Sequence, residues 1–487
     1  MSRSRRQFLE HSMWTTASIF AASQMARPAL AFQDEKKASP NDRLRVAIVG
    51  VNGRGGSHVS QFGKHPKTEI THVCDIDESV GNRVIEGIAE KQGKKPNYVK
   101  DIRKLMEEKS VDIVTIATPN HWHSLAGIWA IQAGKDVYVE KPVSHNVFEG
   151  RQFVTAARKH KKIVQTGTQC RSNPGMRAAM EYIHKGGIGE VKIARGLCYK
   201  RRNAIGPKGT YEVPKNVDYD LWLGPAPMAP LTRPKFHYDW HWQWAYGNGD
   251  LGNQGIHQMD LCRWALQKNA LSDRVLSYGG RFGYEDAGET ANTQLVIHTY
   301  GKQQLVFEVR GLETKPFMGA SVGIIIEGTD GYVVMTSYDS GIAFDPQGKE
   351  VKKFSGGSDD YHFKNFVDAV VARDHKILNA DIEEGHYSSA LCHTGNISYR
   401  LGKQVPAAEV GNYLKDLTGP DDASETLERT LNHLKDNKVD TSKLMVQVGS
   451  NLPFDAAKEE FVGNADANAM LTREYRAPYI VPKTADL

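Results

Sequence analysis

LRVAIVGVNGRGG, residues 44–56, joins a short apolar strand directly to a turn that is rich in glycine. Glycine lets the backbone turn tightly and come close to a ligand, because no Cβ stands in the way. The first N–H groups of a helix that follows such a turn attract phosphate. This arrangement is typical of the dinucleotide-binding βαβ unit, although Asn52 stands where G-x-G-x-x-G would place its second glycine. It predicts nucleotide contacts from the turn residues Gly50, Asn52, Gly53, Arg54 and Gly55.

An acid at the end of the second predicted strand, residues 69–74, bears on the choice of nucleotide. A carboxylate there can accept hydrogen bonds from both ribose hydroxyls, and it repels a 2′-phosphate. We assign this role to Asp75, with Asp77 as a competing candidate. The expected cofactor is therefore NAD, with NADP as the alternative. A tight turn that binds no nucleotide is the other interpretation of the glycines.

Apolar strands and helical stretches alternate in the residues that follow. Strands are predicted at 111–117, 136–139 and 162–165, and helices at 123–133 and 148–160. Short, nearly continuous apolar strands separated by helices predict a parallel sheet that is covered on both faces. The residues from 44 to 167 are therefore expected to form a Rossmann dinucleotide-binding domain of the α/β class.

The pattern changes at about residue 168, where a helix near 175–185 precedes a series of strand-like runs. These runs are residues 275–282, 292–300, 303–310, 322–327 and 332–336. They predict an antiparallel meander, and helices are expected at 359–375 and 382–402. Residues 168–410 are thus predicted to be an α+β domain for substrate binding and oligomerisation, with a large, open, mostly antiparallel sheet.

Residues 411–487 are predicted to be a C-terminal extension that packs on the main body of the protein. They contain a charged helix near 423–436 and apolar patches such as Tyr479-Ile480-Val481. Apolar patches of this kind are expected to pack on the main body of the protein or on a neighbouring subunit.

The first residues carry the features of an export signal. Residues 4–9, SRRQFL, match a twin-arginine motif, residues 13–26 are mildly apolar, and Ala29-Leu30-Ala31 offers a cleavage site. The apolar stretch is shorter than the ~20 residues that a membrane span requires. Residues 1–31 are therefore predicted to be a signal peptide for the twin-arginine route, which exports folded proteins to the periplasm or another exported location. Residues 32–43 are predicted to be a polar linker.

Charge and cysteine content exclude several other classes of protein. Four arginines and one glutamate lie in residues 1–31, so +3 of the net charge of +5 belongs to the signal and about +2 to the mature chain. No run of basic residues indicates nucleic acid or an anionic membrane as a partner. The five cysteines are scattered without a CxxC pair, so neither a disulfide framework nor a zinc cluster or other metal site is expected.

Three polar segments are expected to meet at the carboxyl ends of the parallel strands, where open α/β sheets bind ligands. They are ATPNHWH at 117–123, EKP at 140–142 and GNGDLGNQGIHQMD at 247–260. The first two segments follow predicted strands. They supply the remaining predicted cofactor contacts, which are Thr118, Pro119, Asn120, His123, Glu140 and Lys141.

With these motifs in place, the chain resembles the Gfo/Idh/MocA oxidoreductase family, which includes glucose-fructose oxidoreductase and inositol dehydrogenases. The resemblance extends from about residue 44 to about residue 400. Its anchors are the glycine turn, Ala117-Thr118-Pro119, Glu140-Lys141-Pro142 and the segment that ends in His257. It implies a Rossmann domain followed by a domain with a large open sheet. It also implies subunits that pair through that sheet, as a homodimer or a homotetramer.

The resemblance further implies that Lys141 is a catalytic residue beside the nicotinamide and the substrate carbinol. Oxidation of a secondary alcohol removes a hydride from carbon and a proton from oxygen. A positively charged ring nearby can lower the pKa of a lysine towards a useful range, and the lysine N–H groups can stabilise an alkoxide. Pro142 would stiffen the turn, and the bond before it is a candidate for the cis form. The alternative is a surface lysine after a strand.

His257 matches the family's histidine in a D-x-x-x-H arrangement, whose two positions share one face of a helix. The acid position is Asn253 here, and an asparagine can bind a sugar hydroxyl but cannot act as a base. Asp250 and Asp260 lie nearby without the matching spacing. Proton transfer is therefore assigned to Lys141 and His257, and both Asn253 and His257 are expected to bind substrate. The alternative for His257 is a capping or core histidine.

YDWHWQWAY, residues 238–246, is unusually aromatic for a loop. Aromatic faces pack on the C–H surfaces of sugars, and polar neighbours bind hydroxyls. Trp240 and Trp242 are therefore predicted to bind substrate, with an aromatic core edge or a subunit contact as the alternative. Arg171 is a further predicted substrate residue, and a solvated arginine is its alternative.

Three functions are consistent with these residues. The first is hydride transfer between NAD and a secondary alcohol of a sugar, glycoside or cyclitol, with the cofactor held tightly because free NAD is scarce outside the cytoplasm. The second is NAD-dependent glycoside cleavage through transient oxidation at C3 and elimination, although the Tyr/His pattern expected for that branch is not evident in the sequence. The third is a non-catalytic nucleotide- or sugar-binding protein, against which Lys141 and His257 argue.

Overall fold

The computed structural model of the chain describes residues 43–415 and 417–487. The predicted signal peptide, residues 1–31, and all but the last residue of the predicted linker lie outside the described residues. Within the described ranges, no helix has the length and apolarity that a membrane span requires.

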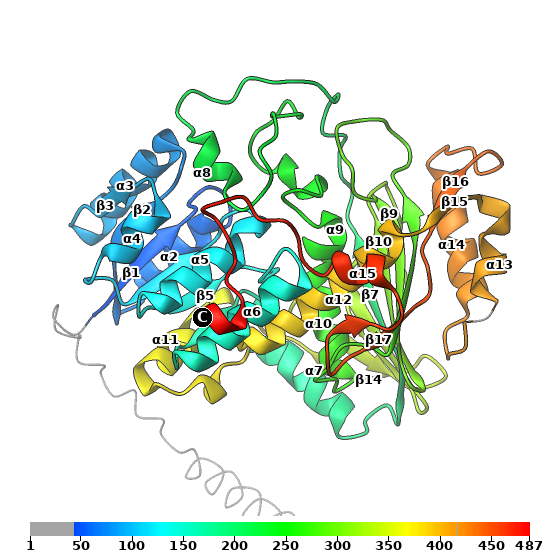
Figure 1. Ribbon diagram of the computed structural model, residues 1–487. Helices are drawn as coiled ribbons and strands as arrows, with labels where there is room; N and C mark the ends of the chain where they lie inside the picture. Colours follow the sequence, from blue (N-terminus) through cyan, green and yellow to red (C-terminus); the bar gives the residue numbers. More distant parts are fainter. Residues whose placement is uncertain (1–42, 416) are drawn as a thin grey trace, which may run out of the picture. The chain divides into compact units, whose positions relative to one another are not determined.

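Six parallel strands form the first sheet, in the order β3-β2-β1-β4-β5-β6 (Figure 1). The strands are β1 Leu44–Val49, β2 Thr68–Cys74, β3 Asn97–Val99, β4 Ile113–Ile116, β5 Asp136–Val139 and β6 Val164–Thr166. Helices cover both faces, so the inner strands are buried and their sequences are continuous apolar runs. The helices that alternate with the strands are α2 Gly55–Lys64, α3 Glu78–Gln92, α4 Ile102–Glu107, α5 Asn120–Gln132 and α6 Val147–Lys159.

A helix from much later in the chain, α11 (Asp359–Ala372), completes the cover of this sheet. Its Phe363 ring stacks on Tyr138 of β5, with the ring centroids 4.6 Å apart. Phe366 contacts the same tyrosine and also Phe62 of α2. Aromatic pairs of this kind add to the apolar area that they bury, so α11 fixes α2, the helix after the glycine turn, against β5.

The second sheet has twelve strands, and its main path is β14-β13-β12-β11-β7-β10-β9-β8-β16-β15. Every pairing in it is antiparallel except that between β7 and β10. The strands are β7 Val191–Tyr199, β8 Arg274–Gly280, β9 Thr293–Tyr300, β10 Gln303–Arg310, β11 Val322–Gly328, β12 Tyr332–Met335, β13 Gly341–Phe344, β14 Glu350–Phe354, β15 Lys403–Pro406, β16 Met445–Val448, β17 Leu452–Asp455 and β18 Glu460–Phe461.

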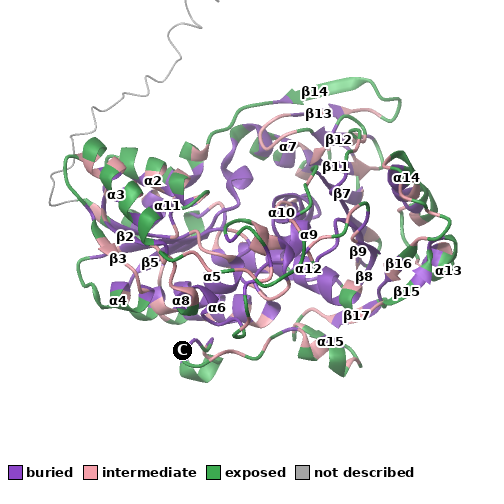
Figure 2. Cartoon of the chain, turned by 90° about the horizontal axis from the view of Figure 1, so that it is seen from above, coloured by how far each residue is buried: buried purple, intermediate pink, exposed green. Residues whose placement is uncertain are grey.

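Helices lie on both faces of the second sheet. On the face towards the first sheet, α10 and α12 are almost entirely buried between the two sheets (Figure 2). On the other face, Leu427 and Leu434 of α14 pack into one apolar cluster with residues of β8, β9 and β10. The longer helices are α7 Pro174–His184, α10 Gly255–Ala265, α12 Ile382–Arg400 and α14 Ala423–Asp436. The shorter ones are η2 Gln169–Ser172, α8 Tyr219–Leu223, η3 Asp239–Trp242, α9 Gly249–Gly252, η4 His375–Ile377, η5 Ala407–Glu409, α13 Val410–Leu414, α15 Ala465–Ala469 and η6 Thr484–Asp486.

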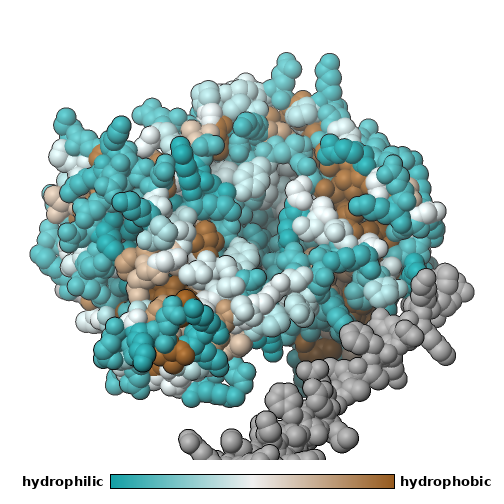
Figure 3. Space-filling view, turned by 180° about the vertical axis from the view of Figure 1, so that it is seen from behind, coloured by the Kyte–Doolittle hydropathy of each residue, from teal (hydrophilic) through white to brown (hydrophobic). Residues whose placement is uncertain are grey.

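The fold class predicted from the sequence is confirmed, with a Rossmann domain followed by a domain with a large, mostly antiparallel sheet. The central strand β7 was not predicted, because its apolar run is interrupted by Arg195. That arginine is buried and pairs with Glu308 at 3.0 Å and with Asp421. Seen from behind, the protein surface is mostly hydrophilic, and its hydrophobic side chains form separate small patches (Figure 3).

Glu149 of α6 is a fully buried carboxylate between the first domain and the C-terminal residues. It accepts hydrogen bonds from the His145 N–H at 2.9 Å, the Asn146 amide at 2.9 Å and the Tyr475 hydroxyl at 3.2 Å. Burial raises its pKa to about 7, although the nearby Arg473 guanidinium and these hydrogen bonds act in the opposite direction. Folding therefore disfavours the charged form of Glu149.

This pKa predicts a loss of stability as the pH rises from about 4.5 to about 7. A carboxyl whose pKa rises on folding contributes stability that is fully present below its unfolded pKa of about 4.5 and is lost as the pH rises through 7. The shift corresponds to about 3 kcal/mol in the free energy of unfolding. We expect a Glu149→Gln variant to lose less of this free energy than the wild type between pH 5 and pH 8 in urea denaturation. The exposed Glu181→Gln serves as the control, and parallel pH profiles for Glu149→Gln and the wild type would contradict the assignment.

Candidate active site

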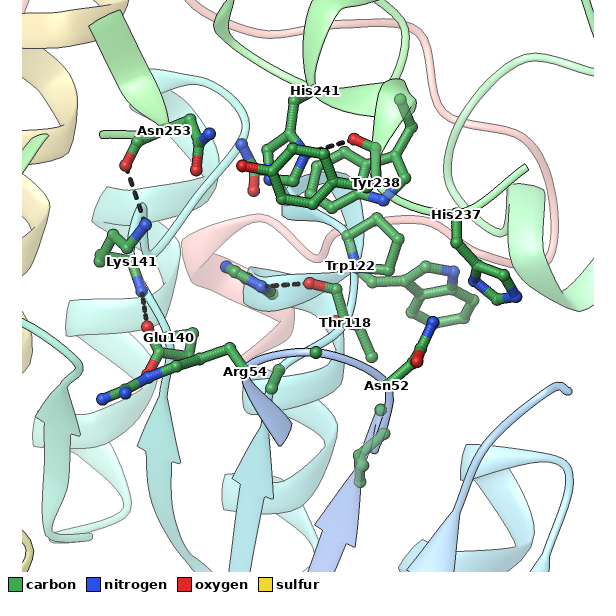
Figure 4. Close-up of a pocket in the computed structure, with 18 of the residues that line it drawn as sticks. Asn52, Arg54, Thr118, Trp122, Glu140, Lys141, His237, Tyr238, His241 and Asn253 are labelled. Carbon is green, nitrogen blue, oxygen red and sulfur yellow. Dashed lines mark hydrogen bonds and ion pairs between the residues drawn. The ribbon is translucent and has the colours of Figure 1, made fainter. Parts of the chain in front are cut away.

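A cavity of about 600 Å³ lies at the carboxyl edge of the first sheet, between that sheet and the second domain (Figure 4). Its volume is in the range of small-molecule and cofactor sites. The walls come from the glycine turn, the ends of β2, β4 and β5, the loop 200–248, and residues of α10 and α11 and their flanks. The predicted residues in the lining are Gly50, Asn52, Gly53, Arg54, Asp75, Thr118, Pro119, Asn120, His123, Glu140, Lys141, Trp240, Asn253 and His257.

The glycines of the turn are required for different structural reasons. Gly50 has φ +77°, and a Cβ there would lie 2.9 Å from the backbone of Ala117 and Thr118. Gly53 also has positive φ, at +67°. A Cβ on Gly55 would lie 1.9 Å from the carbonyl oxygen of Gly50, so this glycine permits close packing of α2 and does not itself line the cavity. The result is an open backbone cradle at the start of a helix, which fits the phosphates of a dinucleotide.

Of the two candidate ribose ligands, Asp75 lines the cavity and Asp77 does not. Asp75 lines the cavity and accepts the N–H groups of Val51 at 2.8 Å and Asp77 at 3.0 Å. Burial raises its pKa. Asp77 instead caps α3 through the N–H groups of Ser79 and Val80. Because each carboxylate oxygen of Asp75 has a second acceptor position, the residue fits the role of a ribose ligand.

The segment after β4 is tied to the loop after β5. One ring nitrogen of His123 lies 2.5 Å from the Pro142 carbonyl oxygen, and the other lies 2.7 Å from the Thr118 carbonyl oxygen. The side chain of Asn120 donates to Asn248 at 3.1 Å. The hydroxyl of Thr118 is buried without a hydrogen-bond partner among the described residues. It is therefore available to a ligand in the cavity.

Glu140 was predicted to contact the cofactor, but its carboxylate is engaged by protein donors. It accepts hydrogen bonds from Arg54 Nε at 2.9 Å, His58 Nε2 at 3.2 Å, Gln169 Nε2 at 3.3 Å and the Lys141 N–H at 3.3 Å. Burial alone would raise the pKa of Glu140, and the Arg54 guanidinium with these donors holds it well below its usual range. Glu140 is therefore a fixed negative charge in the cavity wall.

Lys141 connects the two domains at the centre of the cavity (Figure 4). Its Nζ donates to the backbone carbonyl oxygen of Asn253 at 2.8 Å, and the Lys141–Pro142 peptide bond is cis. Burial lowers the pKa of Lys141, although the charge of Glu140 acts in the opposite direction. A buried amine with a lowered pKa is suited to exchange a proton with a ligand.

His257 on α10 lines the same cavity. Its Nδ1 is buried and has no hydrogen-bond partner among the described residues, and its ring centroid lies 5.0 Å from that of Tyr338. Burial, reinforced by the positive charge of Lys141, lowers the pKa of His257 well below its usual value. The ring is thus neutral at physiological pH and offers a nitrogen to a ligand.

The acids near His257 in the sequence are already neutralised by arginines. Asp250 forms a two-point ion pair with Arg202 at 2.8 and 2.6 Å. Asp260 is bound by Arg171 at 2.7 Å. Neither aspartate lines the cavity, so neither replaces the missing acid at position 253.

Two of the predicted substrate residues do not line the cavity. Arg171 is buried in ion pairs with Asp260 at 2.7 Å and Glu384 at 2.9 Å, so its guanidinium serves the packing of the second domain. Trp242 is buried and lies under the Arg202 guanidinium, 5.4 Å from the ring centroid, so it supports a cavity residue without lining the cavity.

Several cavity residues were missed by sequence reasoning. Arg202 follows strand β7, Tyr338 lies between β12 and β13, and Asp359 is the first residue of α11, and none of these places carries a recognisable motif. Trp122 lies in the segment 117–123, and Tyr238 and His241 lie in the aromatic run 238–246. The clearest available signal was the aromatic run 238–246. Its His241 ring stacks on Trp240 with centroids 3.6 Å apart.

Comparisons with known proteins place these features in context. A family profile described as "Oxidoreductase family, NAD-binding Rossmann fold" matches residues 44–168. A second, described as "Oxidoreductase family, C-terminal alpha/beta domain", matches residues 200–432.

Curated relatives match over a shorter part of the chain. A glycosyl hydrolase family 109 protein of Shewanella sp. (strain W3-18-1) is 34% identical over 152 residues, which is 30% of this chain and 33% of the relative. An alpha-N-acetylgalactosaminidase of Shewanella oneidensis is 33% identical over 123 residues, which is 24% of this chain and 27% of the relative. In these matches the chain spans about a quarter to a third of the length of the curated relatives.

Solved structures share the fold at low sequence identity. The WlbA dehydrogenase from Bordetella pertussis, in complex with NADH and UDP-GlcNAcA, has a TM-score of 0.53 at 18% identity, over 72% of this chain and 94% of that chain. A levoglucosan dehydrogenase in complex with NADH and levoglucosan has a TM-score of 0.56 at 16% identity, over 72% of this chain and 95% of that chain.

The cradle geometry predicts that Gly50→Ala weakens NADH binding at least about tenfold. A side chain at φ +77° is strained, and the new Cβ would push the turn away from Ala117. The affinity can be measured from the change in tryptophan fluorescence on titration with NADH. Gly56→Ala is the matched control, because a Cβ there meets nothing within 4 Å. Equal affinities for the two variants would show that the turn does not hold the nucleotide.

Proposed function

This chain belongs to the Gfo/Idh/MocA oxidoreductase family, and we propose that it transfers a hydride between NAD and a secondary alcohol of a sugar, glycoside or cyclitol. Its first domain is an NAD-binding Rossmann domain. The observation that carries the proposal is the buried Lys141 amine, which shares one cavity with the neutral His257 ring and the glycine cradle. The aromatic residues Tyr238, Trp240 and His241 on the opposite wall suit the faces and hydroxyls of a sugar.

The bound cofactor supplies the hydride acceptor or donor, and the protein supplies the proton chemistry. In the oxidising direction, Lys141 Nζ in its neutral form accepts the proton of the carbinol oxygen while the hydride leaves the carbon. Burial of Lys141 makes the neutral amine accessible, and its remaining N–H groups can donate to the developing alkoxide. The carbonyl oxygen of Asn253 orients Nζ for both tasks.

His257 is proposed to bind and orient the reacting hydroxyl and to share in the proton transfer. Its free Nδ1 can accept a hydrogen bond from a carbinol, and its neutral state avoids repulsion of Lys141 in the ammonium form. The side chain of Asn253 is proposed to bind a second hydroxyl. No carboxylate is required in this scheme, which is consistent with the pairing of Asp250 by Arg202.

We propose that the protein is exported by the twin-arginine route with its cofactor already bound. The motif at residues 4–9 supports export. Contacts beside Asp75 support retention, since residues 216–218 and the cavity residue His237 bond to residues 76–78. These contacts are the Asp218 N–H to Ile76 O at 3.1 Å, the Glu78 N–H to Asn216 O at 3.2 Å, and His237 Nε2 with Asp77 at 3.1 Å.

The central experiment is to purify the exported protein, identify any bound nucleotide by mass spectrometry, and follow the absorbance of the nicotinamide across a panel of sugars, polyols and glycosides. The proposal expects bound NAD or NADH and reduction by at least one carbohydrate, with a keto sugar as the product. A protein that binds no nicotinamide nucleotide, or one that no carbohydrate reduces, would contradict it.

Replacement of Lys141 tests the catalytic assignment. We expect Lys141→Met to lower the rate of cofactor reduction by about 10²–10⁴-fold, the typical contribution of a positioned acid or base. Nucleotide affinity should change little, because Lys141 bonds to Asn253 and not to the glycine turn. The rate is measured in single-turnover stopped flow, and Lys200→Met, which removes a neighbouring cation, is the control. Full turnover by Lys141→Met would overturn the assignment.

A second candidate function, NAD-dependent glycoside cleavage, is favoured by the names of the curated relatives and by the cavity wall. Tyr238 and His241 lie together there, with His241 Nδ1 2.5 Å from the Tyr238 carbonyl oxygen. Burial lowers the pKa of His241 to about 3, which keeps the ring unprotonated at neutral pH but makes it a weak base. In this route Lys141 takes the O3 proton as the hydride leaves C3, His241 removes the acidified C2 proton, and the aglycone departs with the electrons of the C1–O bond and takes up a proton. Water then adds at C1 while C2 regains its proton, and the hydride returns to C3 as O3 is protonated again.

Product analysis with a nitrophenyl glycoside separates the two candidates. Release of nitrophenol without net change in the cofactor supports cleavage, and accumulation of a keto-glycoside with reduced cofactor supports the dehydrogenase. If cleavage is observed, we expect His241→Asn to lower nitrophenol release at least about 10²-fold while C3 oxidation persists. Unchanged release in that variant would exclude His241 as the base.

A further inference from the structure

The C-terminal tail, residues 472–487, crosses from α15 back to the first domain and ends beside α6 (Figure 1). It lies outside the ranges that the two family profiles match, 44–168 and 200–432. Tyr479 and Val481 are each 2% exposed and belong to the apolar core of the first domain. The tail is therefore an anchored part of the fold, and the contacts between its anchor points connect it to the cavity.

Arg473 joins two segments that flank the cavity. Its Nη1 donates to the carbonyl oxygen of Ala245 at 3.0 Å and to Nδ1 of His145 at 3.2 Å. Since an arginine only donates, Nδ1 of His145 is the acceptor and its Nε2 carries the proton that is donated to the Trp244 carbonyl oxygen at 2.9 Å. His145 follows the Lys141–Pro142 turn, so Arg473 holds the end of the aromatic run against the loop after β5.

Arg476 holds a second part of the same wall. It donates to the carbonyl oxygens of Gly224 at 3.0 Å and Asp220 at 2.7 Å, and it pairs with the Asp220 carboxylate at 2.5 Å. These residues belong to α8 and its end, and α8 carries the cavity residues Leu221 and Trp222. Three bonds to one short helix fix it to the tail.

Tyr479 packs against a residue of the cavity wall. Its ring packs edge-on against Trp122, with centroids 5.5 Å apart. Trp122 lines the cavity and donates from its indole N–H to the carbonyl oxygens of Leu221 and Trp222, each at 3.0 Å. The tail thus contacts both sides of the junction between α5 and α8, at which two cavity tryptophans meet.

We propose that Arg473 and Arg476 are positioning residues that hold the cavity wall formed by residues 219–246 in the conformation that retains the nicotinamide nucleotide. Neither arginine lines the cavity, so they act through α8, the end of the aromatic run and His145. The inference rests on nucleotide binding in this cavity and not on the identity of the carbohydrate substrate.

The test measures NADH binding to the full chain, from quenching of tryptophan fluorescence, together with the dissociation rate constant of NADH in stopped flow. We expect Arg476→Ala and Arg473→Ala each to raise the Kd about tenfold, mainly through faster dissociation, because charged donors to backbone carbonyls are lost. Arg476→Lys, which keeps the charge and part of the bonding, should restore a substantial part of the affinity. Glu474→Ala is the matched control, since its side chain is exposed between the two arginines, and it should bind as the wild type does.

Thermal unfolding of the variants distinguishes a specific loss of NADH affinity from a general loss of folding. The proposal expects thermal unfolding midpoints of the nucleotide-free arginine variants close to that of the wild type, with the loss confined to NADH affinity and to the tryptophan signal. If an alanine variant does not fold, Asp220→Asn decides the question, and a wild-type dissociation rate of NADH in that variant would overturn the proposal. Wild-type binding by the alanine variants would overturn it as well. A wild-type chain that does not bind NADH would instead contradict the cofactor assignment on which the proposal rests.

Discussion

The buried carboxylate of Glu140 is the charge around which the cofactor side of the cavity is organised. Its donors come from the glycine turn, from α2 and from η2, and its neighbour in the chain is Lys141. A buried charge that loses one partner destabilises a protein by several kcal/mol, so the carboxylate and its donors have to be placed together. The position of this carboxylate also explains why residue 167 is a glycine, because a Cβ there would lie 2.8 Å from the Glu140 carboxylate.

From this anchor, polar contacts extend into the second domain. Arg54, which pairs with Glu140, also forms an ion pair with Asp359 at the start of α11, and Lys141 donates a hydrogen bond to the backbone of Asn253. The same carboxylate that fixes the turn therefore also sets the electrostatic environment of the lysine. Burial pushes the pKa of Lys141 down, and Glu140 limits that shift. These two opposing effects therefore act on the amine to which proton transfer is assigned in the proposed function.

Much of this arrangement was predictable because its signals are local. The strand and glycine turn at 44–56, the acid Asp75 and the EKP turn are each recognisable within a few residues, and each contributes at least one residue to the cavity lining. Arg171 shows the limit of that reasoning. An arginine after a strand has the same local sequence whether it faces a ligand or an acid far along the chain, and its partner Asp260 is 89 residues away. Strand β7 was missed for a similar reason, because the partners that neutralise Arg195 lie far along the chain, at Glu308 on β10 and at Asp421 just before α14.

The contact between Lys141 and position 253 is made by a carbonyl oxygen of the main chain. Every amino acid supplies that oxygen, so the anchor of the lysine does not depend on which side chain stands there. Under the proposed function, a substitution at position 253 would therefore change the side chain that is presented to the substrate and leave the anchor of the lysine in place.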